Sequence, residues 1–263
     1  MKRYLLILVV ACGMVQAHSQ SYSVIHVLGK IYDTRTKMYL RPGVTLDGSA
    51  SLKLETPDAK AAVLSPSKGR FILQRSGPAM GQHDLVYTLS ALITPVKGRL
   101  STRSGAIAGD VDLVKKFSEG PSAFIGDRYM VTVSPVAFPM NETRYFYATF
   151  LYRSERINKR LYNRGDTLIF DRSSFFSVDG KPVDPSETSD HELIYMEEDL
   201  GNTSSWKGPD FVVVSDTDLS QLADGVKMLK GQERIDAVQE LISSLYGAVT
   251  EEEVRTALKR LGK

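Results

Sequence analysis

The chain has 263 residues, of which 42% are hydrophobic and 24% are charged, the composition of an ordinary globular protein. That length suffices for one large domain or two small ones, each with its own core. Without Lys2 and Arg3, which precede the predicted cleavage point, 31 basic residues balance 31 acidic ones. We therefore expect no nucleic-acid partner, because phosphate neutralisation requires a clustered excess of Lys and Arg.

The first elements in chain order form the pattern of a secretory signal peptide, which we assign to residues 1–19. Lys2 and Arg3 are its positive region, residues 5–11 are its apolar run, and Ala17-His18-Ser19 is a small-residue exit. The apolar run is shorter than the ~20 residues of a membrane helix, and no later stretch is long enough either. We expect an exported protein of the periplasm or cell envelope without a transmembrane segment.

Cys12 gives the leader a second interpretation. Residues 9–12, Val-Val-Ala-Cys, are similar to a bacterial lipoprotein box, in which the cysteine is acylated and anchors the mature protein. We favour simple cleavage near Ser19, and the alternative is lipidation at Cys12. Because Cys12 is the only cysteine, cleavage near Ser19 would leave no disulfide.

Residues 20–76 are predicted to form an N-terminal β module, a small barrel or sandwich. A first strand is indicated by the β-branched run at 23–32, and Arg41-Pro42-Gly43 is typical of a turn. Three short strands should follow, at 51–54, 61–64 and 70–73.

The segment Ser65-Pro66-Ser67-Lys68 matches the S-x-x-K pattern of some acyl-transfer enzymes. In those enzymes the motif opens a helix. Here Pro66 and Gly69 flank it between two predicted strands, and no SDN or KTG triplet accompanies it. We interpret it as a hairpin turn.

Within residues 24–73, the runs VIHVLGKIYD, LRPG and DAKAAVLSPSKGRFIL resemble the N-terminal module of uncharacterised secreted proteins from Bacteroidetes-type bacteria. They are also loosely similar to the periplasmic β domain of FecR-type anti-sigma regulators, with its glycine-led strand and L-x-x-G turn. The resemblance implies secretion and a β fold. It implies no functional residue, because we expect neither the transmembrane helix nor the anti-sigma segment of those regulators here.

Residues 77–123 are predicted to be a helix and a mobile linker, and a Gly/Pro linker at 76–81 precedes the helix. Leucines at helical spacing over 83–93 predict a helix, which Pro95 ends. The polar, Gly/Ser-rich stretch 99–109 indicates a long loop, and a brief helical turn should follow at 111–117.

Residues 124–215 are predicted to form a second module, an antiparallel β sandwich. The aromatic run at 144–153 indicates a central strand covered on both faces, and core packing is favoured over a carbohydrate platform around Tyr145. The other predicted strands and turns are strands at 129–133, 167–170, 193–196 and 211–214, and turns at 164–166 and 178–181.

Residues 216–263 change to helical periodicity and are predicted to form a tail of three amphipathic helices. Gly231 and Gly247 should end the first two, and Thr250 with Glu253 is a capping box for the third. Packing on the preceding domain is the favoured role. The alternative is a docking element for a partner.

No motif in the sequence indicates a catalytic, cofactor or metal site. Ser189-Asp190-His191-Glu192 holds three triad residue types, but adjacent residues cannot adopt triad geometry. His26 and His83 are interpreted as structural histidines, since no metal-ligand spacing is found. Carboxylates between 184 and 199 suit a Ca²⁺ ligand set, but a solvated acidic loop is favoured.

A basic cluster gives a candidate interaction patch on the loop after the aromatic strand, although a charged hairpin tip without a binding role is the favoured interpretation. Its members are Arg153, Arg156, Lys159, Arg160 and Arg164. The patch would dock against the acidic stretch or against anionic envelope polymers.

From these observations we expect an exported envelope or periplasmic protein that acts as a binding or adaptor protein for an envelope protein partner. Catalytic activity and cofactors are not expected. Two alternatives remain: a hydrolase with an unfamiliar active site, for which 99–109 would be a lid, and an outer-membrane lipoprotein with a structural role. A deep pocket holding two or more titratable residues would favour the hydrolase.

Overall fold

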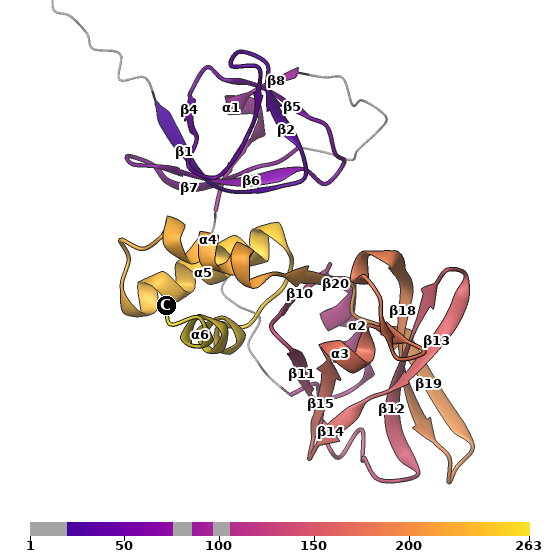
Figure 1. Cartoon of the computed structure of the whole chain (residues 1–263). Coiled ribbons are helices and arrows are strands. Elements are labelled where there is room, and N and C mark those ends of the chain that lie inside the picture. The colour runs from indigo at the N-terminus through magenta and orange to yellow at the C-terminus, as the bar shows by residue number, and fades with distance from the viewer. Residues whose placement is uncertain (1–19, 76–85, 97–105) are drawn as a thin grey trace, which may run out of the picture.

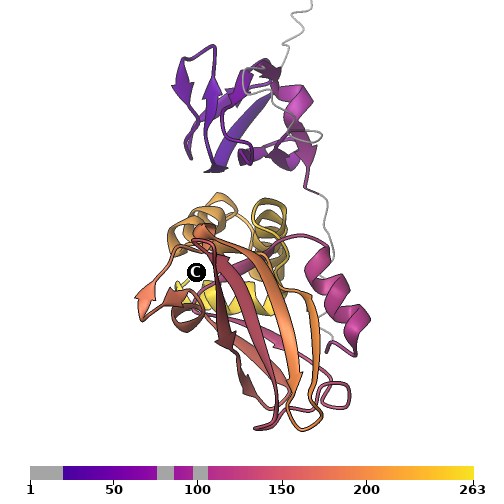
Figure 2. The same cartoon turned by 90° about the vertical axis from the view of Figure 1, so that its right-hand side faces the viewer.

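The protein is described by a computed structural model for residues 20–75, 86–96 and 106–263. Strands make up 43% of the chain and helices 24%, so the predicted class, mainly β with a C-terminal helical region, is confirmed. Two β modules are stacked with the C-terminal helices between them (Figure 1; Figure 2, turned by 90°). The predicted leader, the linker at 76–81 and residues 99–105 of the predicted loop lie outside the described residues.

The first module is a sandwich of two antiparallel sheets. One sheet has the order β4-β1-β6-β7-β9 and the other β3-β2-β5-β8, and no sheet among the described residues closes into a barrel. The strands are β1 (Ser21–Leu28), β2 (Ile31–Asp33), β3 (Met38–Tyr39), β4 (Thr45–Asp47), β5 (Ser51–Leu54), β6 (Lys60–Ser65), β7 (Gly69–Leu73), β8 (Val86–Thr88) and β9 (Ile93–Pro95). The hairpin interpretation of Ser65–Lys68 is confirmed, because Ser65 pairs with Gly69 across the turn.

The first strand is shorter than predicted because the chain crosses between sheets at Gly29. Gly29 has φ of +67°, a left-handed conformation that favours glycine, and a side chain there would collide with Thr56. β1 therefore ends at Leu28, and Ile31 begins β2 in the second sheet. The β-branched run at 23–32, which was predicted to be one strand, therefore belongs to two strands in different sheets.

The helix predicted at 83–93 is wrong over its described part. Val86–Thr88 is strand β8, which pairs with β5, and only Leu89–Leu92 is helical, as the single turn α1. Leu89 and Leu92 are both 1% exposed and fill the core of the sandwich. Two leucines three residues apart fit one helical turn, and strand pairing on either side prevents a longer helix.

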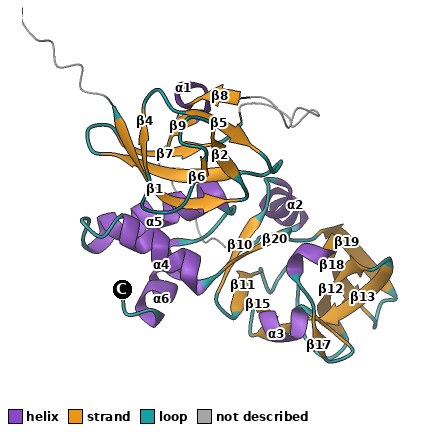
Figure 3. Cartoon of the chain, turned by 45° about the horizontal axis from the view of Figure 1, so that its top comes forward, coloured by secondary structure: helices purple, strands orange, loops and turns teal. Residues whose placement is uncertain are grey.

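The second module contains a three-stranded and a four-stranded sheet around one aromatic-rich core. Helix α2 (Asp110–Ser118) covers that core with Leu113 and Phe117, as the short helical turn predicted. The remaining elements are β11 (Arg128–Thr132), β12 (Arg144–Tyr152), β13 (Glu155–Arg160), β14 (Tyr162–Arg164), β15 (Thr167–Asp171), α3 (Arg172–Phe175), β16 (Ser177–Val178), β17 (Lys181–Pro182), η1 (Pro185–Glu187), β18 (Thr188–Glu197) and β19 (Asn202–Lys207). Figure 3 distinguishes these strands from the helices beside them.

One pair of strands departs from the predicted antiparallel sandwich. β10 (Ser122–Ile125) and β20 (Phe211–Val214) lie parallel, with Phe124 opposite Val213. Both faces of this pair are covered: Phe124 and Phe211 belong to the core of the second module, whereas Ile125 and Val214 face the C-terminal helices. A parallel pair buried on both faces matches its uninterrupted apolar sequence.

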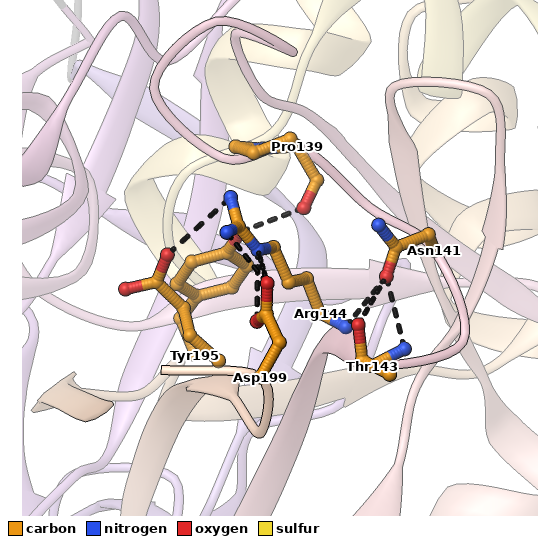
Figure 4. A network of polar contacts seen from close by, with 7 residues as sticks. Pro139, Asn141, Thr143, Arg144, Tyr195 and Asp199 are labelled. Atoms are coloured by element: carbon orange, nitrogen blue, oxygen red, sulfur yellow. Dashed lines mark hydrogen bonds and ion pairs between the residues drawn. The ribbon is translucent and has the colours of Figure 1, made fainter. Parts of the chain in front are cut away.

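A polar network fixes one end of the four-stranded sheet (Figure 4). The guanidinium of Arg144 donates to both carboxylate oxygens of Asp199, with Nη2–Oδ2 at 2.7 Å, and Asn141 Oδ1 accepts the amide of Arg144 at 2.8 Å. The Tyr195 hydroxyl donates to the carbonyl of Pro139 at 2.6 Å. These contacts hold the chain entering β12 against the end of β18.

The tail forms the predicted three helices, α4 (Asp216–Gly225), α5 (Gly231–Leu245) and α6 (Glu251–Arg260). Thr250 and Glu253 make both hydrogen bonds of the capping box. Gly231 does not end a helix as predicted but begins α5, and α4 ends at Gly225. No helix formed by the described residues is long and apolar enough to cross a membrane.

The tail is an internal layer that joins the two modules. Its core cluster includes Ile25, Ala62 and Ile72 from the outer face of the first module, and Ile125 and Val214 from the second. α4 contacts β1, α5 contacts β6, and α6 contacts β10. The favoured prediction, packing of the helices on the preceding domain, is confirmed.

Candidate functional site

A large cleft opens where α6 meets the second module. Its volume is about 1350 Å³, larger than the roughly 300–1,000 Å³ of a small-molecule pocket. One wall is α6, a second is β11, and a third is α3 with the hairpin after it. The size and the strand-lined wall suit an extended chain better than a compact ligand.

Four of the charged side chains that line the cleft are ion-paired within the protein. Arg128 Nε lies 3.5 Å from Asp171 Oδ2, and Arg260 bridges Asp127, with Nη1–Oδ2 at 4.0 Å, and Asp216. The guanidinium of Arg260 lies over Gly126, where a side chain would come within 2.9 Å of its Nη1. Arg260 thus connects α6 to the β10–β11 turn and to α4, and Arg128 connects β11 to β15.

A further cation of the cleft is Lys116. It projects from α2 into the cleft, with its Nζ 5.8 Å from the centre of the Tyr129 ring. No carboxylate of the described residues lies within 4.0 Å of that Nζ. Burial lowers the pKa of the Lys116 ammonium, and the charge of Glu253 opposes the shift. A half-buried ammonium without a close counter-ion is a group that an incoming anion would stabilise.

Glu253 faces the same cleft from α6. Its Oε2 accepts the amide and the hydroxyl of Thr250, each at 2.8 Å, in the capping box. Burial raises the pKa of the Glu253 carboxyl, and the two Thr250 hydrogen bonds oppose that shift. The capping role alone accounts for this residue, but the cleft contains two half-buried titratable groups, Lys116 and Glu253, with shifted pKa values.

Sequence reasoning missed Lys116 and found Glu253 only as a cap. A signal for Lys116 was present: it lies three residues after Leu113 and directly before Phe117, both of which are buried. A lysine on the apolar side of a short amphipathic helix marks a charge facing inward. No signal placed α2 and α6 on either side of one cleft.

The candidate basic patch is not one surface in the structure. Arg156 and Arg160 project from one face of β13 and Lys159 from the other, and Arg164 belongs to β14 in a different sheet. Arg153 has φ of +49° in the turn before β13, and its guanidinium carbon lies 4.9 Å from the Tyr152 ring centre. The predicted loop is therefore mostly strand.

Several of these cations are engaged internally. Arg156 pairs with Asp190 at 2.5 Å and with Glu192 at 3.8 Å, which is the docking against the acidic stretch that the sequence suggested. The guanidinium of Arg160 lies 3.8 Å from the Tyr145 ring centre, and Lys159 Nζ lies 3.5 Å from Ser177 Oγ. Arg164 is exposed.

The aromatic strand is divided between two environments. Phe146 and Phe150 lie in the core, as favoured, whereas Tyr145 and Tyr147 point to the other face and are half-buried. The prediction of a strand covered on both faces is wrong, because nothing among the described residues packs as a layer over the outer face. Tyr145 donates its hydroxyl to Glu198 at 2.7 Å.

The acidic stretch is spread over separate contacts. Asp184 caps η1, Asp190 and Glu192 pair with Arg156, and Asp199 pairs with Arg144. Within the described residues, no group of three or more His, Cys, Asp or Glu side chains is arranged to hold a metal ion.

Two of the histidines lie inside the protein, and His83 lies outside the described residues. His26 is 3% exposed, with Nδ1 2.9 Å from Gln221 Oε1 and Nε2 2.8 Å from the Tyr246 hydroxyl, so it ties β1 to α4 and α5. His191 is 8% exposed beside Phe150 and Phe175, in β18. Neither lines the cleft.

His191 predicts a pH dependence of stability. Burial lowers its pKa below 6.5, while the carboxylate of Asp210, 3.5 Å from Nδ1, opposes the shift. The unfolded chain binds the His191 proton more tightly than the folded chain does. The free energy of unfolding is therefore unaffected by this group above pH 6.5, and it decreases as the pH falls from 6.5 toward the lower pKa of the folded state. Denaturant unfolding from pH 8 to pH 5 should show a shallower acid decline for His191→Phe than for the native chain. Equal declines would contradict it.

Comparison of the chain with protein-family models and with curated proteins gives no match. The resemblance to secreted Bacteroidetes-type proteins and to the FecR-type β domain therefore remains a sequence-based prediction.

Proposed function

We propose that the chain is an exported protein that acts by binding a partner protein of the cell envelope, and that the cleft between α6 and β11 receives this partner. The observation that carries the proposal is the cleft itself: its volume is about 1350 Å³, it opens where α6 meets the second module, and it contains the half-buried cation Lys116, which has no carboxylate of the described residues within 4.0 Å. A binding role requires no assembled nucleophile and base, and in the described part of the cleft no histidine accompanies its hydroxyl groups.

Site-specific photo-crosslinking tests this proposal in cells of the source organism. A photoreactive residue is placed in the cleft at Met130 or at Thr256, and a control is placed at Met228, which is 86% exposed and lies outside the cleft. We expect one envelope protein, identified by mass spectrometry, to be crosslinked from both cleft positions and not from Met228. Absence of a cleft-specific partner would refute the proposal.

A hydrolase is the second candidate, because the cleft contains two titratable groups with shifted pKa values, Lys116 and Glu253. Lys116→Met and Glu253→Gln are the informative variants, since glutamine can keep the capping box. A hydrolytic activity that is lost in both variants, while both unfold at the native midpoint, would establish the hydrolase. The binding proposal expects no such activity.

Export and anchoring are proposed from the leader. A mature N-terminus near Ser19 supports cleavage to a free protein, whereas an acylated Cys12 supports the lipoprotein alternative. Cys12→Ala should release a lipoprotein from membranes and leave the distribution of a cleaved protein unchanged.

A further inference from the structure

One edge of β11 lies in the cleft and is paired with no other strand of the described residues. β11 pairs with β15 on one side, and residues 129, 131 and 133 face that partner, as the hydrogen bond from the Val133 amide to the Asp166 carbonyl at 2.9 Å shows. In an antiparallel ladder the alternate residues turn their backbone groups to the opposite side. The N–H and C=O of Met130 therefore point to the open edge, and no described residue forms a hydrogen bond with either.

The same edge already accepts one residue of a further strand. Ile107 forms a parallel bridge with Val133: its amide donates to the Thr132 carbonyl at 2.9 Å, and its carbonyl accepts the Ser134 amide at 2.7 Å. Strand pairing at this edge is thus geometrically established at one end of β11.

One other sheet edge of the second module is protected from such pairing. The edge strand β13 carries Glu155, Arg156, Lys159 and Arg160, the charged pattern that prevents unwanted strand addition. β11 instead presents Met130, 53% exposed, near Ile107 and Ile125 in the cleft lining. An exposed edge residue whose backbone groups have no partner among the described residues is a template for an added strand.

We propose that an extended segment of the partner protein binds by adding a strand to the edge of β11 at Met130, with an acidic side chain placed near Lys116. The strand would form backbone hydrogen bonds with Met130, and the walls formed by α6 and α3 would enclose its side chains. The acidic residue is argued from charge complementarity, because the half-buried ammonium of Lys116 has no carboxylate of the described residues within 4.0 Å. This inference rests on the proposed function and specifies its mode of binding.

A proline variant tests the backbone contact directly. Met130→Pro removes the N–H that the added strand needs, and proline is tolerated on an edge strand whose N–H faces outward. Met130→Val is the matched control, because it changes the side chain and keeps the N–H. The probe is a displayed library of random linear peptides, selected on the native chain and assayed by fluorescence anisotropy.

We expect enriched peptides rich in acidic and β-branched residues. Loss of the backbone contacts should weaken binding about tenfold or more in Met130→Pro. Binding to Met130→Val should stay within about twofold, and Lys116→Met should weaken it about tenfold. Equal binding to the proline and valine variants, or no enriched peptide, would overturn the inference.

A second measurement does not depend on the folding of a variant. Hydrogen exchange followed by NMR should show a fast-exchanging Met130 amide in the free native chain and a protected one with bound peptide. Protection already present in the free chain would mean that the chain itself covers this edge, and the inference would fail. A cleft-specific crosslinked partner together with failed peptide tests would leave the proposed function standing and reject only strand addition.

Discussion

Deletion of residues 216–263 is expected to abolish the cooperative unfolding of the chain. The reason is that α4, α5 and α6 supply most of the core cluster between the two modules, including Leu219, Leu241 and Leu258, each at most 4% exposed. Each buried Leu, Ile or Val contributes about 1.5–3 kcal/mol, so losing a handful of them outweighs the roughly 5–15 kcal/mol of a domain's stability. Circular dichroism during thermal unfolding measures the transition.

The truncated chain should also bind a hydrophobic dye, because Ile25, Ala62 and Ile72 would face water. Met228→Ala in the full chain is the control, and its effect should stay within about 0.5 kcal/mol, since this side chain is 86% exposed. A truncated chain that melts at the native temperature without dye binding would show that the helices are an appended tail and not a core layer.

Phe124→Ala is expected to lower the free energy of unfolding by about 3–5 kcal/mol, the usual cost of truncating a buried phenylalanine. Phe124 is fully buried in β10, with the rings of Phe211, Tyr129 and Phe176 centred 5.0, 6.1 and 6.1 Å away. Its removal leaves a cavity under strand-paired backbone that cannot collapse. Urea unfolding of the native and variant proteins measures the difference.

Val136→Ala is the control for this substitution, because Val136 is 91% exposed and should change stability by no more than about 0.5 kcal/mol. The substitution at Phe124 should also disturb the cleft, because the next residue, Ile125, lines it. A Phe124→Ala chain with native stability would contradict the assignment of this ring to the core.

Local patterns determined much of the fold. The capping box at Thr250 and Glu253, the hairpin at Ser65–Lys68 and the three tail helices follow from residues within a few positions of one another. Strand β12 was found because its aromatic and β-branched residues favour a pleated surface. The mainly β class with a helical C-terminal region could thus be predicted from the sequence.

Where the sequence misled, the deciding contact came from a distant segment. Val86–Thr88 has helical spacing with the leucines after it, but pairing with β5 makes it a strand. The charged run at Glu155–Arg160 was predicted to be a loop because apolar and polar residues do not alternate in it. An edge strand needs few apolar residues, however, when the neighbouring strand, here β12, provides most of the side chains that face the core.

The cleft was decided by tertiary structure alone. It brings together Lys116 on α2, Met130 on β11 and Glu253 on α6, and the parallel pairing of β10 with β20 sets where those elements meet. None of the three carries a motif, because binding at a strand edge uses backbone groups that every residue possesses. Sequence periodicity records which side of its own element a residue occupies, whereas a site between elements depends on long-range packing that no local pattern contains.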